Sequence, residues 1–300
     1  MVLPPTEQPN PLSQELDRLA PLELARLMNR QDAGVPAAVA EALPQIARAI
    51  QAIAEGMAQG GRLFYQGAGT SGRLGALDAA ELGPTFSLEP GRAVALIAGG
   101  PTALTQSVEG AEDDPDQGAA DLAAHGFRPP DVLVALAASG RTPYVLGGLR
   151  HANGLGAVTI GVACNPDTPL LAEAQIPILA LTGPEVLTGS TRLKAGTAQK
   201  LVLNMLSTGA MVRLGKVYGN RMVDVQPANR KLRRRAVGMV MDLVGVDEVQ
   251  ARELLEASGW QVKVAVVMGI SGTGAAEAQA ALERAGGRVR EALVQLVRHG

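Results

Sequence analysis

Apolar residues recur at helical spacing through the first sixty residues of this 300-residue chain. Leucine, isoleucine and alanine return every three or four positions from about Pro11 to Gly60, and the stretch ends at the pair Gly60-Gly61. That period places the apolar side chains on one face of a helix. We therefore expect residues 1–60 to form two or more helices that pack on the body of the protein.

The next part of the chain alternates short apolar runs with longer segments. Five runs have the length of strands: Leu63–Tyr65, Ala93–Ile97, Val132–Leu136, Val158–Val162 and Ile176–Leu181. The segments between them are long enough for crossover helices, which predicts an α/β domain over 61–230 with a parallel five-stranded sheet flanked by helices. Pro177 predicts that the last strand lies at an edge or starts there, because proline cannot donate to a central ladder.

A basic stretch, Arg230 to Arg235, separates this domain from a tail of different character. We interpret it as a solvated helix face or a domain junction. Short helical patterns then follow between glycine-containing turns, which predicts a small helical bundle over 236–300 that resembles ubiquitin-associated three-helix modules. We assign the bundle to packing or dimer support. The patterns cover Val237–Leu243, Glu248–Ala257, Val262–Met268 and Ala275 to about Ala285.

The amino-acid composition limits the classes of partner that we expect for this chain. With 47% hydrophobic residues the chain can bury a core, whereas a net charge of −2 and 2% aromatic residues argue against a nucleic-acid partner. The uncharged stretches are interrupted by glycine and proline, so we expect no membrane partner. The single cysteine, Cys164, and the absence of a cleavable leader pattern at the start predict a cytoplasmic protein.

The most informative motif is the glycine-rich segment 67–73, which follows the first predicted strand and precedes a helical stretch. The free N–H groups and the positive dipole end of a helix bind phosphate without a metal. Gly67, Gly69 and Gly72 also match a dinucleotide-binding pattern, but the second strand lacks the acidic residue that holds a ribose. Two hydroxyls between the glycines suit a phosphate monoester better. The candidate phosphate-binding residues are Gly69, Thr70, Ser71, Gly72 and Arg73.

Two further polar clusters follow other strands. The triplet Ser-Gly-Arg of residues 71–73 recurs at 139–141, and a third cluster precedes the long apolar helix expected over 195–214. Each cluster alone could be helix capping. Turns that follow parallel strands share the carboxyl edge of the sheet, where open α/β folds bind ligands, so three together favour a sugar-phosphate site. The added candidates are Ser139, Gly140, Arg141, Thr142, Ser190, Thr191, Arg192 and Lys194.

Glu81 and Glu112 are the candidates for acid–base chemistry, although spacing alone does not separate them from exposed surface carboxylates. No histidine neighbours a serine in a nucleophile-elbow context, which disfavours hydrolysis by a serine triad. One cysteine and no paired histidine spacing indicate no metal site. We expect neither a metal nor another cofactor.

Longer motifs resemble one family closely. The chain is similar over nearly its full length to the N-acetylmuramic acid 6-phosphate etherases, which belong to the SIS sugar-phosphate superfamily. The resemblance rests on residues 67–86, 108–114, 137–144, 164–166, 185–200, 215–220 and 222–225, and on Thr6-Glu-Gln8 with Asn10. Leu82 and Gly83 depart from it, because a cysteine and a proline are usual there, and glycine makes the backbone near Glu81 less rigid.

The resemblance implies a cofactor-free lyase that cleaves the D-lactyl ether of N-acetylmuramic acid 6-phosphate. It implies that Glu112 is the base at C2, that Glu81 is the acid at the departing lactate, and that the small-molecule sugar phosphate is bound by a homodimer. Arg192 or Lys194 would stabilise the phosphate or the enolate. The resemblance leaves three alternatives: a non-catalytic sensor similar to the glucokinase regulatory protein, the SIS module of a transcription regulator, and an aldose–ketose isomerase.

Helix geometry raises a difficulty for Glu81. A helix that ran unbroken from Ser71 would carry Glu81 about 15 Å from the phosphate turn, which exceeds the distance between a C6 phosphate and a C3 ether. Either Gly75 or Asp78 ends the helix early, or Glu81 acts in the site of a neighbouring subunit. We favour the second.

Overall fold

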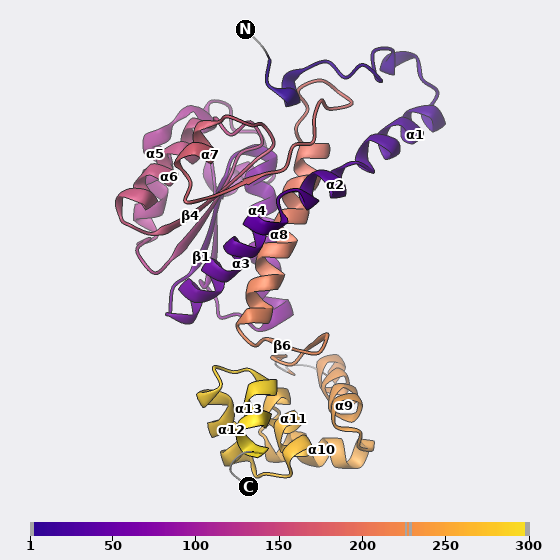
Figure 1. Ribbon diagram of the computed structural model, residues 1–300, viewed down its shortest axis with the longest axis vertical. Helices are drawn as coiled ribbons and strands as arrows, with labels where there is room; N and C mark the ends of the chain where they lie inside the picture. The colour runs from indigo at the N-terminus through magenta and orange to yellow at the C-terminus, as the bar shows by residue number, and fades with distance from the viewer. Residues whose placement is uncertain (1–2, 226, 228–229, 298–300) are drawn as a thin grey trace. The chain divides into compact units, whose positions relative to one another are not determined.

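The computed structural model describes residues 3–225, 227 and 230–297 (Figure 1). It divides into two compact units. Unit 1 comprises Met1–Glu81 and Pro90–Gly209, and unit 2 comprises Leu82–Glu89 and Ala210–Gly300. No helix in the described part of the chain combines the length and apolar character that a membrane crossing requires.

Unit 1 is built on a five-stranded sheet in which every pairing is parallel, with the order β2-β1-β3-β4-β5. The predicted apolar runs coincide with the strands to within two residues, because the central strands β1 and β3 are buried along their whole length and the edge strands β2 and β5 are at least half-buried. β5 is the last strand of this order and pairs with β4, which confirms the edge position expected from Pro177. The strands are β1 Leu63–Gly67, β2 Ala93–Ile97, β3 Val132–Leu136, β4 Val158–Ala163 and β5 Ile176–Leu179.

Helices cover both faces of this sheet (Figure 1). Phe64 and Leu133 point into a cluster with α5 and α6, whereas Tyr65 and Leu136 point to the opposite face and contact α4 at Gly75. α3 and α8 lie on the same face as α4. The helices of this unit are α1 Pro21–Asp32, α2 Val35–Ala40, α3 Leu43–Ala58, α4 Gly69–Phe86, α5 Pro115–Ala124, α6 Pro143–Gly154, α7 Pro169–Glu173 and α8 Lys194–Arg213, of which α4 and α8 continue into unit 2. Short 3₁₀ turns are η1 Pro5–Glu7, η2 Leu16–Arg18, η3 Gly100–Leu104 and η4 Ala111–Asp113.

Unit 2 is helical apart from a short hairpin. The residues of 230–235 form the exposed start of a helix, and helices follow where the glycine-separated patterns predicted them. Val240, Leu255 and Val266 lie in its core. The elements are β6 Val217–Tyr218, β7 Arg221–Met222, α9 Arg230–Val244, α10 Glu248–Ala257, α11 Val262–Ser271, α12 Ala275–Arg284 and α13 Val289–Val297. The last helix was not among the predicted patterns.

Candidate active site

Two glycine turns lie side by side at the carboxyl edge of the sheet. One begins α4 after β1, and the other, residues 139–142, follows β3, which pairs directly with β1. The third cluster is joined to the first turn through α8, because the Ser71 hydroxyl donates to Gln199 Oε1 at 2.9 Å. The structure therefore brings all three clusters to one edge of unit 1.

The first turn depends on a close approach at Gly72. A Cβ atom there would lie 2.6 Å from the Ile97 side chain and 2.8 Å from the Gly67 carbonyl oxygen. Only glycine lets α4 begin this close to the strands. The first-turn amides of α4, at Gly69, Thr70 and Ser71, are the kind of donor that binds an anion.

The second turn carries two hydroxyl side chains at the start of α6. The Arg141 backbone N–H donates to the Ser139 hydroxyl at 3.2 Å, and Gly140 has a φ of +67°. Thr142 is the N-cap residue of α6, but its side chain makes no capping hydrogen bond. The first residue of α6, Pro143, has no N–H, and the Val145 N–H donates to the Thr142 carbonyl at 3.1 Å. The hydroxyls of Ser139 and Thr142 are therefore the donors that this turn can offer to an anion.

The start of α8 is different, because a carboxylate of the protein already occupies it. Glu185 is fully buried and accepts the backbone N–H groups of Lys194 at 3.0 Å and Ala195 at 2.9 Å. A negative charge at a helix N-terminus is favourable. These two amides are consequently taken, which leaves the amides that begin α4 and the hydroxyls of the second turn as the donors for a phosphate.

Lys194 and Arg192 have different surroundings. The Lys194 ammonium is buried and donates to Gln31 Oε1 of α1 at 3.3 Å. Burial lowers the pKa of Lys194, although the carboxylates of Glu185 and Asp32 act in the opposite direction. Arg192 is exposed, together with Ser190 and Thr191 in the partly exposed loop, and within the described residues its guanidinium has no hydrogen bond or ion pair. Of the two cations, Arg192 is the one free to meet a ligand.

The two arginines of the repeated triplet hold loops in place. Arg73 donates from Nε to the Leu104 carbonyl at 3.1 Å and from Nη2 to the Gln106 carbonyl at 3.0 Å. Arg141 donates from Nη2 to the Asp167 carbonyl at 3.0 Å. Sequence reasoning placed both in direct contact with the phosphate, whereas these hydrogen bonds show that each guanidinium also braces a neighbouring loop.

Glu112 lies in η4, at the edge where the turns meet. Ala111 packs against the apolar cluster beneath α6, and η4 packs against α6, whose N-terminus follows the second turn. The Glu112 side chain is exposed, and no other described residue forms a hydrogen bond or ion pair with it. The carboxylate is therefore free to act on a ligand.

Glu81 lies elsewhere on α4. The helix is unbroken from Gly69 to Phe86, with Pro84 inside its last turn. Neither Gly75 nor Asp78 ends it, so Glu81 follows Ser71 by about 15 Å along the axis. Its side chain is exposed. Within one chain the carboxylate is thus distant from the turn that begins the same helix.

A buried polar network beneath α4 was not foreseen from the sequence. The Tyr65 hydroxyl donates to Asp78 Oδ2 at 2.7 Å, the Ser207 hydroxyl donates to Oδ1 at 3.2 Å, and Lys200 Nζ lies 3.6 Å from Oδ1. Burial raises the pKa of Asp78, against the hydrogen bonds and the Lys200 charge, which lower it. Asp78 therefore ties α4 to β1 and α8.

Asp78→Ala is expected to lower the free energy of unfolding by about 2–4 kcal/mol, because it leaves the buried Tyr65 hydroxyl without its acceptor and opens a cavity, although the Ser207 hydroxyl keeps the Leu203 carbonyl as an acceptor at 3.0 Å. Urea denaturation measures this change. The exposed Asp17→Ala is the matched control and should stay within about 0.5 kcal/mol of the parent protein. Equal stabilities of the two variants would contradict the structural role of Asp78.

The parallel sheet carries glycine turns at its carboxyl edge, where a ligand can bind. This arrangement places the chain in the SIS class of α/β proteins. The model of the N-terminal SIS domain of the glucokinase regulatory protein matches residues 45–153. A phosphoheptose isomerase from Francisella tularensis shares the fold, with a TM-score of 0.50 and 18% identity over 65% of this chain and 100% of its own. A candidate phosphosugar isomerase of capsule formation from Bacteroides fragilis gives a TM-score of 0.52 and 20% identity over 67% and 95%.

The N-acetylmuramic acid 6-phosphate etherase of Streptomyces coelicolor is 56% identical over 261 residues, which cover 87% of this chain and 84% of that protein. The etherase of Pectobacterium atrosepticum is 53% identical over 87% and 86%. The chain belongs to the N-acetylmuramic acid 6-phosphate etherase family. The family resemblance seen in the motifs is thereby confirmed.

Proposed function

We propose that this chain is a carbon–oxygen lyase that converts N-acetylmuramic acid 6-phosphate to N-acetylglucosamine 6-phosphate and D-lactate. The observation that carries the proposal is the identity of 52–56% to etherases over 87% of the chain. The open amides at the start of α4 and the hydroxyls of the second turn are consistent with a phosphate at the edge of the sheet. The cytoplasm is the proposed location, consistent with a buried free Cys164 whose thiol pKa is raised by burial to about 12.

The proposed reaction begins with the open-chain aldehyde. Glu112 removes the C2 proton, and the electron pair moves to the aldehyde oxygen to form an enolate. The enolate then expels lactate from C3 as the C3–O bond breaks, and Glu81 gives its proton to the departing oxygen. Water adds to C3 of the unsaturated aldehyde with Glu81 as base, and Glu112 returns the proton to C2.

Binding of the phosphate supports these reaction steps because it orients the sugar in the site. The amides that begin α4, with Thr70, Ser139, Gly140 and Thr142, hold the phosphate, so that C2 faces Glu112. Arg192 supplies positive charge to the phosphate or the enolate. The guanidinium stabilises the negative charge that develops on the enolate, and this stabilisation lowers the barrier to proton removal.

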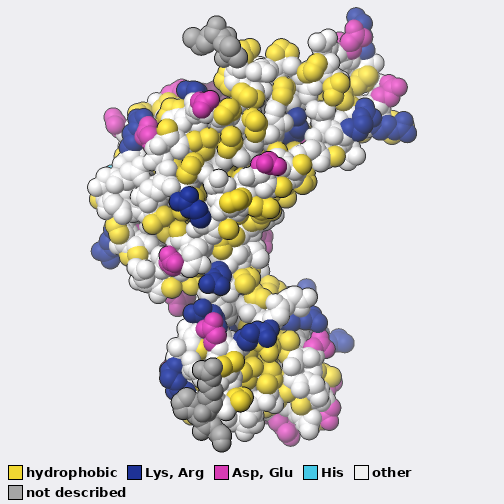
Figure 2. Space-filling view, viewed as in Figure 1, with side chains coloured by type: hydrophobic (Ala, Val, Ile, Leu, Met, Phe, Trp, Pro, Cys, Tyr) yellow, Lys and Arg dark blue, Asp and Glu magenta, His cyan; other side chains and the backbone are white. Residues whose placement is uncertain are grey.

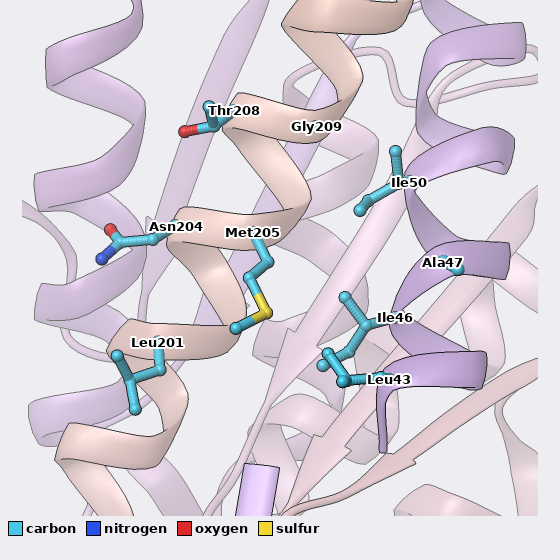
Figure 3. A pocket seen from close by; sticks show the side chains of 9 residues that line it. All are labelled: Leu43, Ile46, Ala47, Ile50, Leu201, Asn204, Met205, Thr208 and Gly209. Atoms are coloured by element: carbon cyan, nitrogen blue, oxygen red, sulfur yellow. The ribbon is translucent and has the colours of Figure 1, made fainter. Parts of the chain in front are cut away.

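A second copy of the chain would supply Glu81. Leu77 is 47% exposed and lies one turn before Glu81 on α4, so a subunit that covered this leucine would also meet the carboxylate. An apolar groove of about 590 Å³ between α3 and α8 lies on the same side of the sheet (Figure 3). Figure 2 shows hydrophobic side chains gathered over α3 and α8. We infer a homodimer from these exposed apolar surfaces.

Mixing two inactive variants tests the shared site. Glu81→Ala and Glu112→Ala, combined by co-expression, should recover up to about one quarter of the parental rate if each site takes one carboxylate from each chain, since half of randomly paired dimers then carry one intact site. Each variant alone should remain inactive. A mixture without recovered activity would show that both carboxylates come from one chain.

Release of D-lactate from N-acetylmuramic acid 6-phosphate tests the function itself. The enzyme is expected to release one D-lactate for each N-acetylglucosamine 6-phosphate formed. A non-catalytic sensor is the second candidate, because the glucokinase regulatory protein model matches residues 45–153. A sensor would bind sugar phosphates without lactate release, and an isomerase would convert aldose to ketose phosphate instead.

A further inference from the structure

The segment that precedes α1 crosses the carboxyl edge of the sheet beside the candidate active site. Thr6 is fully buried there: its backbone N–H donates to Asn165 Oδ1 at 3.1 Å, and its hydroxyl accepts from Asn165 Nδ2 at 2.8 Å. Asn10 is also buried and donates to the Pro184 carbonyl at 3.2 Å. These contacts fix η1 next to the loop that precedes α8 (Figure 1).

The same contacts connect the segment with the phosphate turns. Asn165 Nδ2 also lies 3.4 Å from the carbonyl of Ala138, which immediately precedes the second turn. On the other side, a Cβ placed at Gly189 would lie 3.0 Å from Glu7 Oε2. Residues 6 and 7 therefore stand between the second turn and the loop of the third cluster.

The loop of the third cluster also packs against the first turn. The backbone N–H of Gly196 donates to the Thr191 carbonyl at 2.9 Å, and a Cβ at Gly196 would contact the Thr70 methyl at 3.4 Å. Glu7 consequently lies against a wall shared by the first and third clusters. Any group of a bound sugar that reaches the loop of the third cluster would therefore come close to this carboxylate.

The Glu7 carboxylate has no partner of its own. It is exposed, and within the described residues no side chain or backbone group donates a hydrogen bond to it or forms an ion pair with it. The residues on both sides, Thr6 and Asn10, are by contrast buried and fully engaged. The fold thus anchors the segment firmly while leaving one acceptor free beside the site.

We propose that Glu7 is a substrate-binding residue whose carboxylate accepts a hydrogen bond from a hydroxyl or from the acetamido N–H of the bound amino sugar. This inference rests on the proposed function. An ionised carboxylate only accepts hydrogen bonds. In the substrate the phosphate and the lactyl carboxylate are acceptors, so the hydroxyls and the amide N–H are the groups that can meet Glu7.

Kinetics of Glu7→Gln and Glu7→Ala test the proposal. In Glu7→Ala the KM for N-acetylmuramic acid 6-phosphate should rise about tenfold or more, because a hydrogen bond to a charged group is lost, while kcat changes less. Glu7→Gln should show a smaller rise. Thermal unfolding of both variants should match that of the parent, since Glu7 holds no other part of the described protein.

The matched control is Glu15→Gln. Glu15 lies on the same N-terminal segment, where its carboxylate is already engaged in an exposed ion pair with Arg18, and its replacement should leave KM unchanged. A second measurement separates this inference from the proposed function: calorimetric binding of N-acetylglucosamine 6-phosphate to the parent and both variants. If the parent releases no D-lactate, the proposed function fails, yet weaker binding in the Glu7 variants would still support the role of Glu7. Unchanged KM and binding in Glu7→Ala would overturn it.

Discussion

Glu112→Gln is expected to slow D-lactate release by a factor of about 10²–10⁴, the usual contribution of a general base. The amide cannot take the C2 proton, yet it is nearly the same size as the carboxylate. Since Glu112 is exposed and has no partner among the described residues, its replacement should leave the melting temperature unchanged. The loss should therefore appear in kcat, with the sugar phosphate still bound.

Asp113→Asn provides the control for this experiment. Asp113 is the next residue of η4, is exposed and carries the same charge, so a general electrostatic effect of the acidic run would appear in both variants. We expect Asp113→Asn to retain most of the parental rate. Exchange of the C2 hydrogen with solvent deuterium is a further readout, and it should stop in Glu112→Gln. A variant that still exchanged this hydrogen would exclude Glu112 as the base.

Gly147→Ala is expected to have the largest effect on stability, lowering the free energy of unfolding by about 3 kcal/mol or more. A Cβ at Gly147 of α6 would overlap the backbone carbonyl of Pro115 at the start of α5. Gly118 of α5 meets the Tyr144 carbonyl in the same way. Backbone groups cannot rotate aside as side chains do, so the two helices must separate.

Gly154→Ala supplies the comparison on the same helix. A Cβ at Gly154 would meet nothing within 4 Å, and alanine favours a helix over glycine by up to about 1 kcal/mol. Urea denaturation should therefore show Gly154→Ala as stable as the parent or slightly more so. Similar losses in both variants would show that the close approach of α5 and α6 does not explain the requirement for glycine.

The strands of unit 1 could be predicted from the sequence because a parallel sheet buries both of its faces. Each strand then appears as an uninterrupted apolar run, as at Val132–Leu136, and the polar turns must follow at the carboxyl ends. Pro177 located an edge strand through the chemistry of its missing N–H. These signals are local, so no contact distant in sequence was needed to interpret them.

The course of α4 was less predictable. Gly75 and Asp78 are residues that often end a helix, but here each has a tertiary role. Gly75 lets the helix pack against Tyr65, with a Cβ there 2.9 Å from the tyrosine Cβ, and Asp78 bonds to buried hydroxyls. Tertiary packing therefore overrides the local propensity, and the helix continues to Phe86.

The surroundings of the candidate site residues could not be predicted either, because they are set by contacts between residues far apart in the sequence. Nothing near Lys194 in sequence indicates that Gln31 accepts from its ammonium, 163 positions away. Thr6 and Asn165 both belong to motifs that resemble the family. Their spacing in the sequence does not indicate that they form hydrogen bonds with each other. Hydrogen bonds between distant segments are therefore what sequence patterns omit here.

The hydrogen bonds from Arg73 to the carbonyls of Leu104 and Gln106 have a consequence for catalytic efficiency. It joins the phosphate turn to the loop that leads to Glu112, so this loop is ordered before any sugar arrives. If Glu112 is the base, as proposed, the conformational entropy of positioning it is then lost during folding and not at each encounter with substrate. Under the proposed function, such preorganisation means that less of the substrate's binding energy is needed to order the site.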